Sequence, residues 1–161
     1  MNNTVSFVRP EEAEALWVIR DRVHFMGEVQ GTSLNVLEVE VPPGSGTPPH
    51  VHDSPEIFRV LSGELTYGVF AEGPPAFTTA SPGTVITVPS RVPHNYENRG
   101  STPARMLVVV ERSMAEFFRD LGRPDAPPAG PPTEAEIAAI MAACARHGIT
   151  VLGGPAPART H

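Results

Sequence analysis

The sequence predicts an all-β fold, a sandwich or a barrel, and three observations carry this prediction. Short runs rich in β-branched and aromatic residues follow one another from Trp17 to about Val110. Clusters of Gly, Pro, Asn or Ser separate the runs, and the 19 prolines and 14 glycines of the chain break long helices. Hydrophobic residues make up 40% of the 161 positions, which is enough for one domain with a packed core.

The order of the expected elements follows from these runs. In two of them the apolar residues alternate, beginning with Leu34 and Val36 in one and with Leu65 and Tyr67 in the other, as in strands with one buried face. Before the first run, residues 10–16 are expected to form a short helix or turn. The expected strands are residues 17–27, 32–41, 56–61, 65–70, 84–89 and 104–111.

Two helices are expected after Arg112, where the pattern changes. Residues 113–116 have the Ser-x-x-Glu pattern of a capping box, and Gly122 marks the end of that helix. Residues 133–136 repeat the pattern with Thr at the first position, and Gly148 marks the end of the second helix. Two helices of this length are too small for a second domain, so we expect them to pack on the β-domain or on a partner subunit.

Composition excludes several classes of protein. All 12 basic residues are Arg, which excludes lysine-based Schiff-base chemistry and a GxxxxGK[ST] phosphate loop. The single cysteine, Cys144, excludes an internal disulfide, and we expect a cytoplasmic location. The net charge of −6, with scattered arginines, argues against nucleic acid as a partner. No apolar run approaches the roughly 20 residues that cross a bilayer, so no membrane association is expected.

Three histidines and one glutamate form a candidate metal site. His50 and His52 stand two residues apart, so in an extended strand both side chains project from one face. Glu56 keeps the same parity four residues on, and His94 follows at the end of the 84–89 strand, where it could add a fourth ligand. Imidazoles and a carboxylate on one face can coordinate a divalent cation.

The same parity suggests which residues line a pocket. If Glu56 points inward, Phe58 does so too, while Ile57 and Leu61 point outward. Tyr96 shares parity with His94. Phe58 and Tyr96 are therefore expected either to form an aromatic wall for a planar ligand or simply to fill the core of a small barrel.

The two histidine-containing stretches resemble the two motifs of the cupin superfamily. The first motif reads Gly, five residues, His-x-His, three or four residues, Glu, six residues, Gly; the second reads Gly, five residues, Pro-x-Gly, two residues, His, three residues, Asn. The matching residues are Gly44, His50, His52, Glu56 and Gly63 in the first, and Gly83, Pro89, His94 and Asn98 in the second. Every spacing is met, and only Arg91 stands where the family prefers Gly, a residue that often serves a positive φ there.

This resemblance implies a double-stranded β-helix, the jelly-roll barrel of cupins, with one divalent metal ion inside. His50, His52, Glu56 and His94 correspond to the family's ligands, and the ion could be Fe, Mn, Ni, Zn, Co or Cu. The expected organisation is a cupin β-barrel over residues 1–112, a helical extension packed on the barrel over residues 113–152, and a flexible tail over residues 153–161.

Two flanking segments, residues 15–23 and the C-terminal FFR…PP…ARHGI layout, resemble those of small single-domain bacterial cupins similar to quercetin dioxygenase. This resemblance implies a mononuclear metal-dependent dioxygenase, an oxidoreductase acting on a small aromatic, flavonol-like or enolisable compound. In such an enzyme Glu56 would be a ligand that can detach and act as a catalytic base. Two alternatives remain: a cupin isomerase, epimerase or lyase that uses no oxygen, and a non-catalytic metal- or small-molecule-binding module. By the same analogy the chain is expected to form a homodimer.

Overall fold

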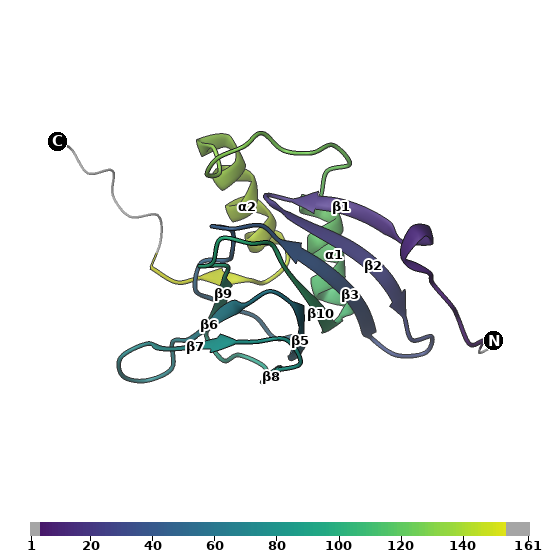
Figure 1. Ribbon diagram of the computed structural model, residues 1–161, viewed down its shortest axis with the longest axis horizontal. Helices are drawn as coiled ribbons and strands as arrows, with labels where there is room; N and C mark the ends of the chain where they lie inside the picture. Colours follow the sequence, from purple (N-terminus) through teal and green to yellow (C-terminus); the bar gives the residue numbers. More distant parts are fainter. Residues whose placement is uncertain (1–3, 154–161) are drawn as a thin grey trace.

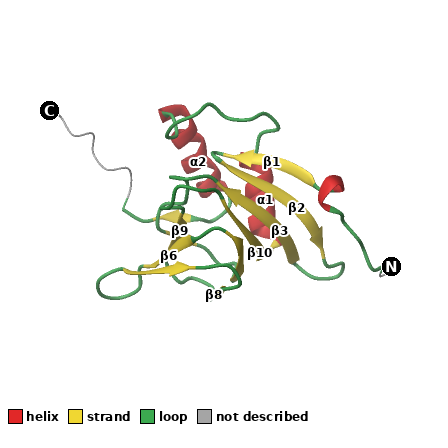
Figure 2. Ribbon diagram, viewed as in Figure 1, coloured by secondary structure: helices red, strands yellow, loops and turns green. Residues whose placement is uncertain are grey.

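The computed structural model describes residues 4–153 and consists mostly of β-strands with two helices (Figures 1 and 2). One sheet has the strand order β1-β2-β3-β10-β5-β8 and the other the order β11-β4-β9-β6-β7. The six-stranded sheet contains β1 (Glu14–Val18), β2 (Asp21–Glu28), β3 (Leu34–Val41), β5 (Glu56–Ser62), β8 (Val85–Val88) and β10 (Ala104–Glu111). The five-stranded sheet contains β4 (His50–Val51), β6 (Leu65–Val69), β7 (Ala76–Ala80), β9 (His94–Glu97) and β11 (Thr150–Val151).

After β3 the chain passes repeatedly from one sheet to the other, and all pairings are antiparallel. β10 lies between β3 and β5, and β9 lies between β4 and β6, so strands distant in sequence become neighbours. The predicted predominance of β-structure is confirmed. Within residues 4–153, the ladders stay inside each sheet, so the strand pairing yields two sheets and does not include the closure expected of a barrel.

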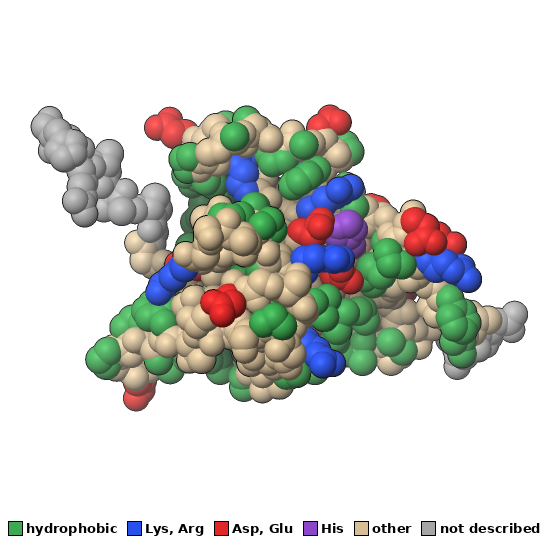
Figure 3. Space-filling model, viewed as in Figure 1, with side chains coloured by type: hydrophobic (Ala, Val, Ile, Leu, Met, Phe, Trp, Pro, Cys, Tyr) green, Lys and Arg blue, Asp and Glu red, His purple; other side chains and the backbone are tan. Residues whose placement is uncertain are grey.

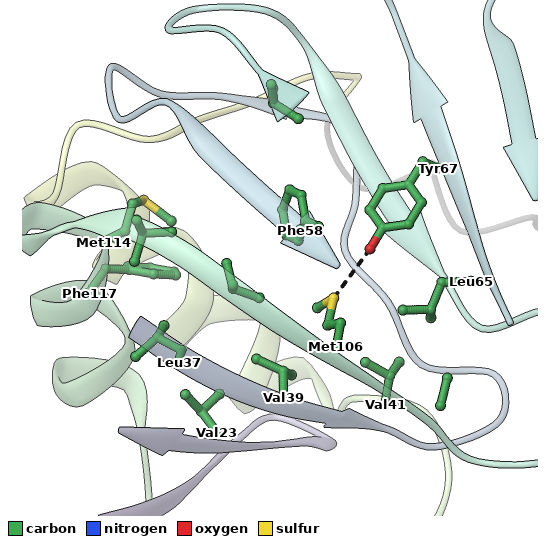
Figure 4. Packing of buried hydrophobic residues seen from close by; sticks show 14 of the residues in the cluster. Val23, Leu37, Val39, Val41, Phe58, Leu65, Tyr67, Met106, Met114 and Phe117 are labelled. Carbon is green, nitrogen blue, oxygen red and sulfur yellow. Dashed lines mark hydrogen bonds between the residues drawn. The ribbon is translucent and has the colours of Figure 1, made fainter. Parts of the chain in front are cut away.

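The hydrophobic core includes inward-facing residues of both sheets (Figure 4). Phe58 of β5, Tyr67 of β6 and Met106 of β10 are all buried, and the Tyr67 hydroxyl donates a hydrogen bond to the Met106 sulfur at 3.3 Å. In β5 the predicted alternation is confirmed, since Phe58 is buried while Ile57 and Leu61 are exposed.

The prediction of which alternate residues of β3 face the core is wrong. Leu34 is 44% exposed, and the buried side chains of this strand are those of Leu37, Val39 and Val41. Both faces of the run carry apolar residues, so the sequence allows either phase. Pairing with β2 and β10 fixes the face that meets the core.

The run at 17–27, predicted as one strand, is divided between two paired strands. β1 and β2 form a hairpin across the turn at Ile19 and Arg20, where Ile19 takes a φ of 60°. Neither residue is a common turn former, so the turn has no local signal. Tertiary contacts hold it: the Arg20 guanidinium donates hydrogen bonds to the Gly130 carbonyl at 2.7 Å and to both carboxylate oxygens of Glu136 at 3.0 Å.

Two helices follow β10. α1 (Arg112–Leu121) begins two residues earlier than the predicted capping box at 113–116 implies, and its N-cap, Glu111, makes no side-chain cap. α2 (Glu134–Arg146) does begin with the predicted capping box at Thr133. α1 contacts β1, β3, β10 and α2, while α2 also contacts β11. Of the predicted tail at 153–161, only Gly153 lies within the described residues. Within residues 4–153, neither helix has the length and apolar character that crossing a membrane requires.

Gly63, between β5 and β6, offers a test of the fold. Its φ is +70°, and a Cβ there would lie 2.7 Å from the Pro103 carbonyl oxygen, whereas Gly31 has a similar φ of +77° and open space around it. We expect Gly31→Ala to lower the free energy of unfolding by about 1–2 kcal/mol through its backbone conformation alone. Gly63→Ala should lower it by about 2–4 kcal/mol, because a steric clash is added. Urea unfolding measures both values, and equal losses would contradict the close approach at Pro103.

Candidate metal centre

Three histidines from neighbouring strands lie close together. His50 begins β4 and His94 begins β9, and these two residues are direct partners in the antiparallel ladder. His52 follows immediately after β4. The candidate ligand nitrogens of all three side chains lie within 4.8 Å of one another, close enough to hold one metal ion between them.

The route by which His94 reaches this cluster differs from the prediction. His94 was expected at the end of the 84–89 strand, but β8 ends at Val88, and the chain then crosses to the other sheet before β9 begins. The crossing is a proline-rich turn, residues 89–93, in which the Val92 amide donates a hydrogen bond to the Pro89 carbonyl. His94 therefore belongs to the same sheet as His50.

Backbone carbonyls fix the orientation of two of the imidazoles. The Nδ1 atom of His50 lies 2.8 Å from the Pro48 carbonyl oxygen, and that of His94 lies 2.7 Å from the Val92 carbonyl oxygen. Because a carbonyl only accepts, both Nδ1 atoms must carry the proton. The Nε2 atom of His50 therefore keeps its lone pair, which is the tautomer that a metal-ligating histidine needs. The Nε2 atom of His94 lies 2.8 Å from the Glu56 carboxylate, which only accepts, so it donates a hydrogen bond there and would have to give up that proton to bind a metal ion.

His52 provides the fit test for a metal ion. Its side chain is buried, with 4% of the residue exposed, and neither ring nitrogen has a hydrogen-bond partner among residues 4–153. Leaving a buried polar group unpaired costs about 1–3 kcal/mol, so such groups call for an explanation. An imidazole with a free lone pair beside His50 and His94 fits a metal ion that completes its bonding.

Glu56 approaches the cluster from the opposite sheet. It begins β5, so the loop at 52–55 carries the chain from one sheet to the other, and the prediction that Glu56 extends the strand of His50 is wrong. Its Oε2 lies 2.8 Å from Nε2 of His94, and its Oε1 lies 3.5 Å from Nε2 of His52. The structure thus brings all four predicted residues together.

The electrostatics of the cluster follow from burial and from the contacts of Glu56. Burial alone would raise the pKa of Glu56, but the attraction of the His52 and His94 imidazoles outweighs it and lowers that pKa to about 2. Burial lowers the pKa of His50 to about 4. At neutral pH the site therefore offers an ionised carboxylate and a neutral imidazole at His50, and both are the forms that bind a divalent cation.

Arg91 holds the loop that carries His52. It takes a φ of 64°, the conformation for which cupins use Gly at this motif position. The Arg91 amide donates a hydrogen bond to the His52 carbonyl at 2.9 Å, and its guanidinium donates one to Asp53 at 2.8 Å. These two hydrogen bonds of Arg91 connect the turn before β9 to the loop between β4 and β5.

A cavity of about 330 Å³ adjoins the cluster, and most of its lining is apolar. His50, Glu56 and His94 border it at one end, together with the predicted pocket residues Phe58 and Tyr96. Side chains of α1 and α2 also border it, a contribution that strand parity could not reveal. These helical residues are Met114, Phe117, Phe118, Leu121, Ile137, Ile140, Met141 and Cys144.

Asp21 and Ser45 also line this cavity, and neither was among the predicted site residues. The Asp21 carboxylate accepts hydrogen bonds from the Ser45 hydroxyl and from the Tyr96 hydroxyl, each at 2.5 Å. Burial raises the pKa of Asp21 to about 6, although the two hydroxyl donors oppose the shift. The one available signal was an aspartate within the apolar run at 17–27.

Another histidine and the cysteine lie outside the cluster. His24 contacts Glu40 across β2 and β3, with Nε2 3.0 Å from the carboxylate. Cys144 is buried on α2, at the helical end of the cavity.

Comparison with known proteins agrees with this geometry. Residues 37–110 match the family described as Cupin domain. No curated protein matches the chain in sequence. Among solved structures, the polyketide cyclase RemF from Streptomyces resistomycificus aligns with a TM-score of 0.60 at 22% identity, covering 68% of this chain and 80% of that one.

Two further structures are similar. An RmlC-like cupin from Shewanella frigidimarina aligns with a TM-score of 0.60 at 18% identity, covering 73% of this chain and 99% of that one. A sugar phosphate isomerase of the cupin superfamily from Silicibacter pomeroyi aligns with a TM-score of 0.56 at 21% identity, covering 65% and 74%. At these identities the likeness concerns the fold alone. The match to the Cupin domain family spans residues 37–110, and this stretch includes both histidine-containing motifs.

Proposed function

We propose that this protein binds one divalent metal ion through His50, His52, Glu56 and His94, and acts as a metal-dependent dioxygenase on a small aromatic, flavonol-like or enolisable compound. The observation that carries the proposal is His52, a buried imidazole with no hydrogen-bond partner among residues 4–153, whose candidate ligand nitrogen lies within 4.8 Å of those of His50 and His94. The proposed dioxygenase activity rests, in addition, on the resemblance of the sequence to cupins similar to quercetin dioxygenase.

The donor set favours a borderline transition metal. Three imidazoles and a carboxylate suit Fe, Mn, Co, Ni, Cu or Zn, and no thiolate or thioether is among the four proposed ligands. When bound, such an ion would act as a Lewis acid that lowers the pKa of a substrate hydroxyl.

The cavity favours a small and mostly apolar substrate. A volume of about 330 Å³ is at the lower end for a ligand pocket, and its lining within residues 4–153 includes no arginine. Because the chain has no lysine either, a phosphorylated substrate would lack a cationic partner there. Phe58 and Tyr96 would contact the faces of a planar ring, and the apolar walls would exclude water.

Glu56 is proposed as a ligand, and its contacts favour that role over the role of a base. Its two oxygens already face His52 and His94, at 3.5 and 2.8 Å. With a pKa of about 2, its carboxylate stays ionised and holds the Nε2 side of His94 in place.

Replacing His52 with a residue of similar volume tests the metal site. We expect His52→Leu to raise the free energy of unfolding of the metal-free protein by about 1–3 kcal/mol, because it removes an unpaired buried polar group. The same change should weaken metal binding more than about 100-fold, since loss of a group that only supports a ligand already costs roughly 10–100-fold. Calorimetric titration with Mn²⁺, Ni²⁺ and Zn²⁺ measures affinity, and urea unfolding in chelator measures stability.

His24→Leu is the matched control for this experiment. It removes a histidine that is bonded to Glu40, so it should neither stabilise the metal-free protein nor change metal affinity. Metal binding that survives in His52→Leu would remove His52 from the proposed ligand set.

Oxygen uptake separates the candidate functions. The wild type, loaded in turn with Fe²⁺, Mn²⁺, Ni²⁺ or Zn²⁺, should consume oxygen with flavonols or β-diketones in an electrode assay. Glu56→Ala and His50→Ala should lose roughly 100-fold or more of that rate, and His24→Ala should retain it. Turnover without oxygen uptake would favour an isomerase, epimerase or lyase. Metal-dependent thermal stabilisation with no turnover on a broad panel would favour a binding module.

We further infer that the chain forms a homodimer through the outer face of the six-stranded sheet. Ile57, Leu61 and Val85 are 46%, 42% and 55% exposed on the paired strands β5 and β8. Figure 3 also shows hydrophobic side chains along the lower edge of the molecule, where β8 lies in Figure 1. Burying an apolar patch favours association.

Light scattering after gel filtration tests the dimer. The wild type should give a mass near twice 17.2 kDa, and the double variant Ile57→Glu with Leu61→Glu should give a monomer. Val29→Glu, at another exposed apolar position, should remain a dimer. A wild type of about 17.2 kDa would contradict the inference.

A further inference from the structure

One carboxyl group faces the cavity without a basic partner. Asp21 begins β2, is only 6% exposed, and borders the same cavity as Glu56 and Tyr96. None of the ion pairs found within residues 4–153 includes it. A buried carboxyl group that lacks a cation is costly for the fold, so its position calls for an explanation beyond packing.

The hydrogen bonds of Asp21 leave it able to accept more. The Ser45 hydroxyl donates to Oδ1 and the Tyr96 hydroxyl donates to Oδ2, each at 2.5 Å. A carboxylate oxygen has two accepting positions, so one remains on each oxygen, and the Tyr96 oxygen can accept as well. Both hydroxyl protons, those of Ser45 and Tyr96, are used in bonds to Asp21. Asp21 and Tyr96 can therefore offer only hydrogen-bond acceptors to a ligand in the cavity.

Asp21 lies close to the candidate metal centre. Tyr96 stands two residues after His94 on β9, so both side chains project from the same face, with their Cα atoms roughly 7 Å apart. The Tyr96 ring spans the distance from β9 to Asp21. Apolar residues of β3, β10, α1 and α2 make up most of the remaining wall.

We propose that Asp21, held by Ser45 and Tyr96, is a second ligand-binding subsite that accepts a hydrogen bond from a hydroxyl group of the substrate. The inference rests on the proposed function and deepens it. The substrate would be a ring compound with a chelating oxygen pair for the metal centre, an apolar body, and a hydroxyl group at the Asp21 end. Such a subsite would favour hydroxylated compounds over otherwise identical ones, because the analogue would leave a buried acceptor unpaired.

The ionisation of Asp21 supports the subsite. Burial raises the pKa of this carboxyl to about 6, so at pH 7–8 it is mostly ionised and accepts a charge-assisted hydrogen bond. Tyr96 is the titratable group in contact with it. The other titratable groups that border the cavity are His50, Glu56, His94 and Cys144.

A matched pair of proteins and a matched set of probes test the proposal. The probes are 3-hydroxyflavone, which carries the chelating pair, and 3,7- and 3,4′-dihydroxyflavone, which each add one hydroxyl. Dissociation constants are measured at pH 7.5 by fluorescence titration of the full chain, both as purified and after chelator treatment. The variant is Asp21→Asn, and the control is Asp125→Asn, the same change at an exposed position of the connector before α2.

At least one dihydroxyflavone should bind the wild type and Asp125→Asn more than about 10-fold tighter than 3-hydroxyflavone does, as expected for a hydrogen bond to a charged group. Asp21→Asn should reduce this preference to about 2-fold or less. No preference in the wild type, or the same preference in Asp21→Asn, would overturn the subsite and leave the proposed function standing. If none of the three flavones binds the wild type, the proposed substrate class is wrong and the subsite for it is wrong too.

Stability provides a readout independent of any ligand. The folded pKa of Asp21, about 6, lies above its ordinary value of 3.8. The contribution of Asp21 to the stability of the wild type should therefore fall as the pH rises from about 4 through 6, and Asp21→Asn should lack that fall. We expect a higher melting temperature than wild type for Asp21→Asn at pH 8 and little difference at pH 4. A lower melting temperature at pH 8 would make Asp21 a structural hydrogen-bond acceptor and overturn the proposal.

Discussion

The candidate site depends on the passage of the chain from one sheet to the other within the loop at 52–55. This passage places His52 just after β4 of one sheet and Glu56 at the start of β5 in the opposite sheet. Nε2 of His52 then lies 3.5 Å from Oε1 of Glu56. The hydrogen bond from the Arg91 amide to the His52 carbonyl holds the loop against the turn before β9. Two segments distant in sequence are thereby fixed at one point, and the imidazoles of both can face a single carboxylate.

The geometry of the site opposes the stability of the fold. An unpaired buried imidazole at His52 and a buried carboxyl group without a cation at Asp21 both disfavour folding. The strained backbone at Ile19 and Arg91 adds to this. The core compensates, with apolar residues of both sheets and of α1 and α2 packed in one cluster. Unfavourable features of this kind, at and beside the residues that line one cavity, are typical of a binding site.

The ligand set and much of the local geometry could be predicted from the sequence. Two motifs with fixed spacing name His50, His52, Glu56 and His94, and the period of two along β5 gives the inward direction of Phe58. The first inference depends on residue types and on the spacing of the motifs. The second depends on distances along a single strand, which the backbone geometry fixes.

Other features were decided only by the tertiary structure. The phase of β3 depends on which of two apolar faces meets the core, and the turn at Ile19 is held by Arg20 through contacts with residues more than 100 positions away. The assignment of Glu56 to the opposite sheet, and the meeting of Asp21 with Tyr96, arise in the same way. Residue types and their spacing along the chain indicate which groups are candidate metal ligands, because the chemistry of those groups is local. Only the fold decided what surrounds them, because contacts between distant segments depend on how the strands pair and pack, and no local pattern encodes that pairing.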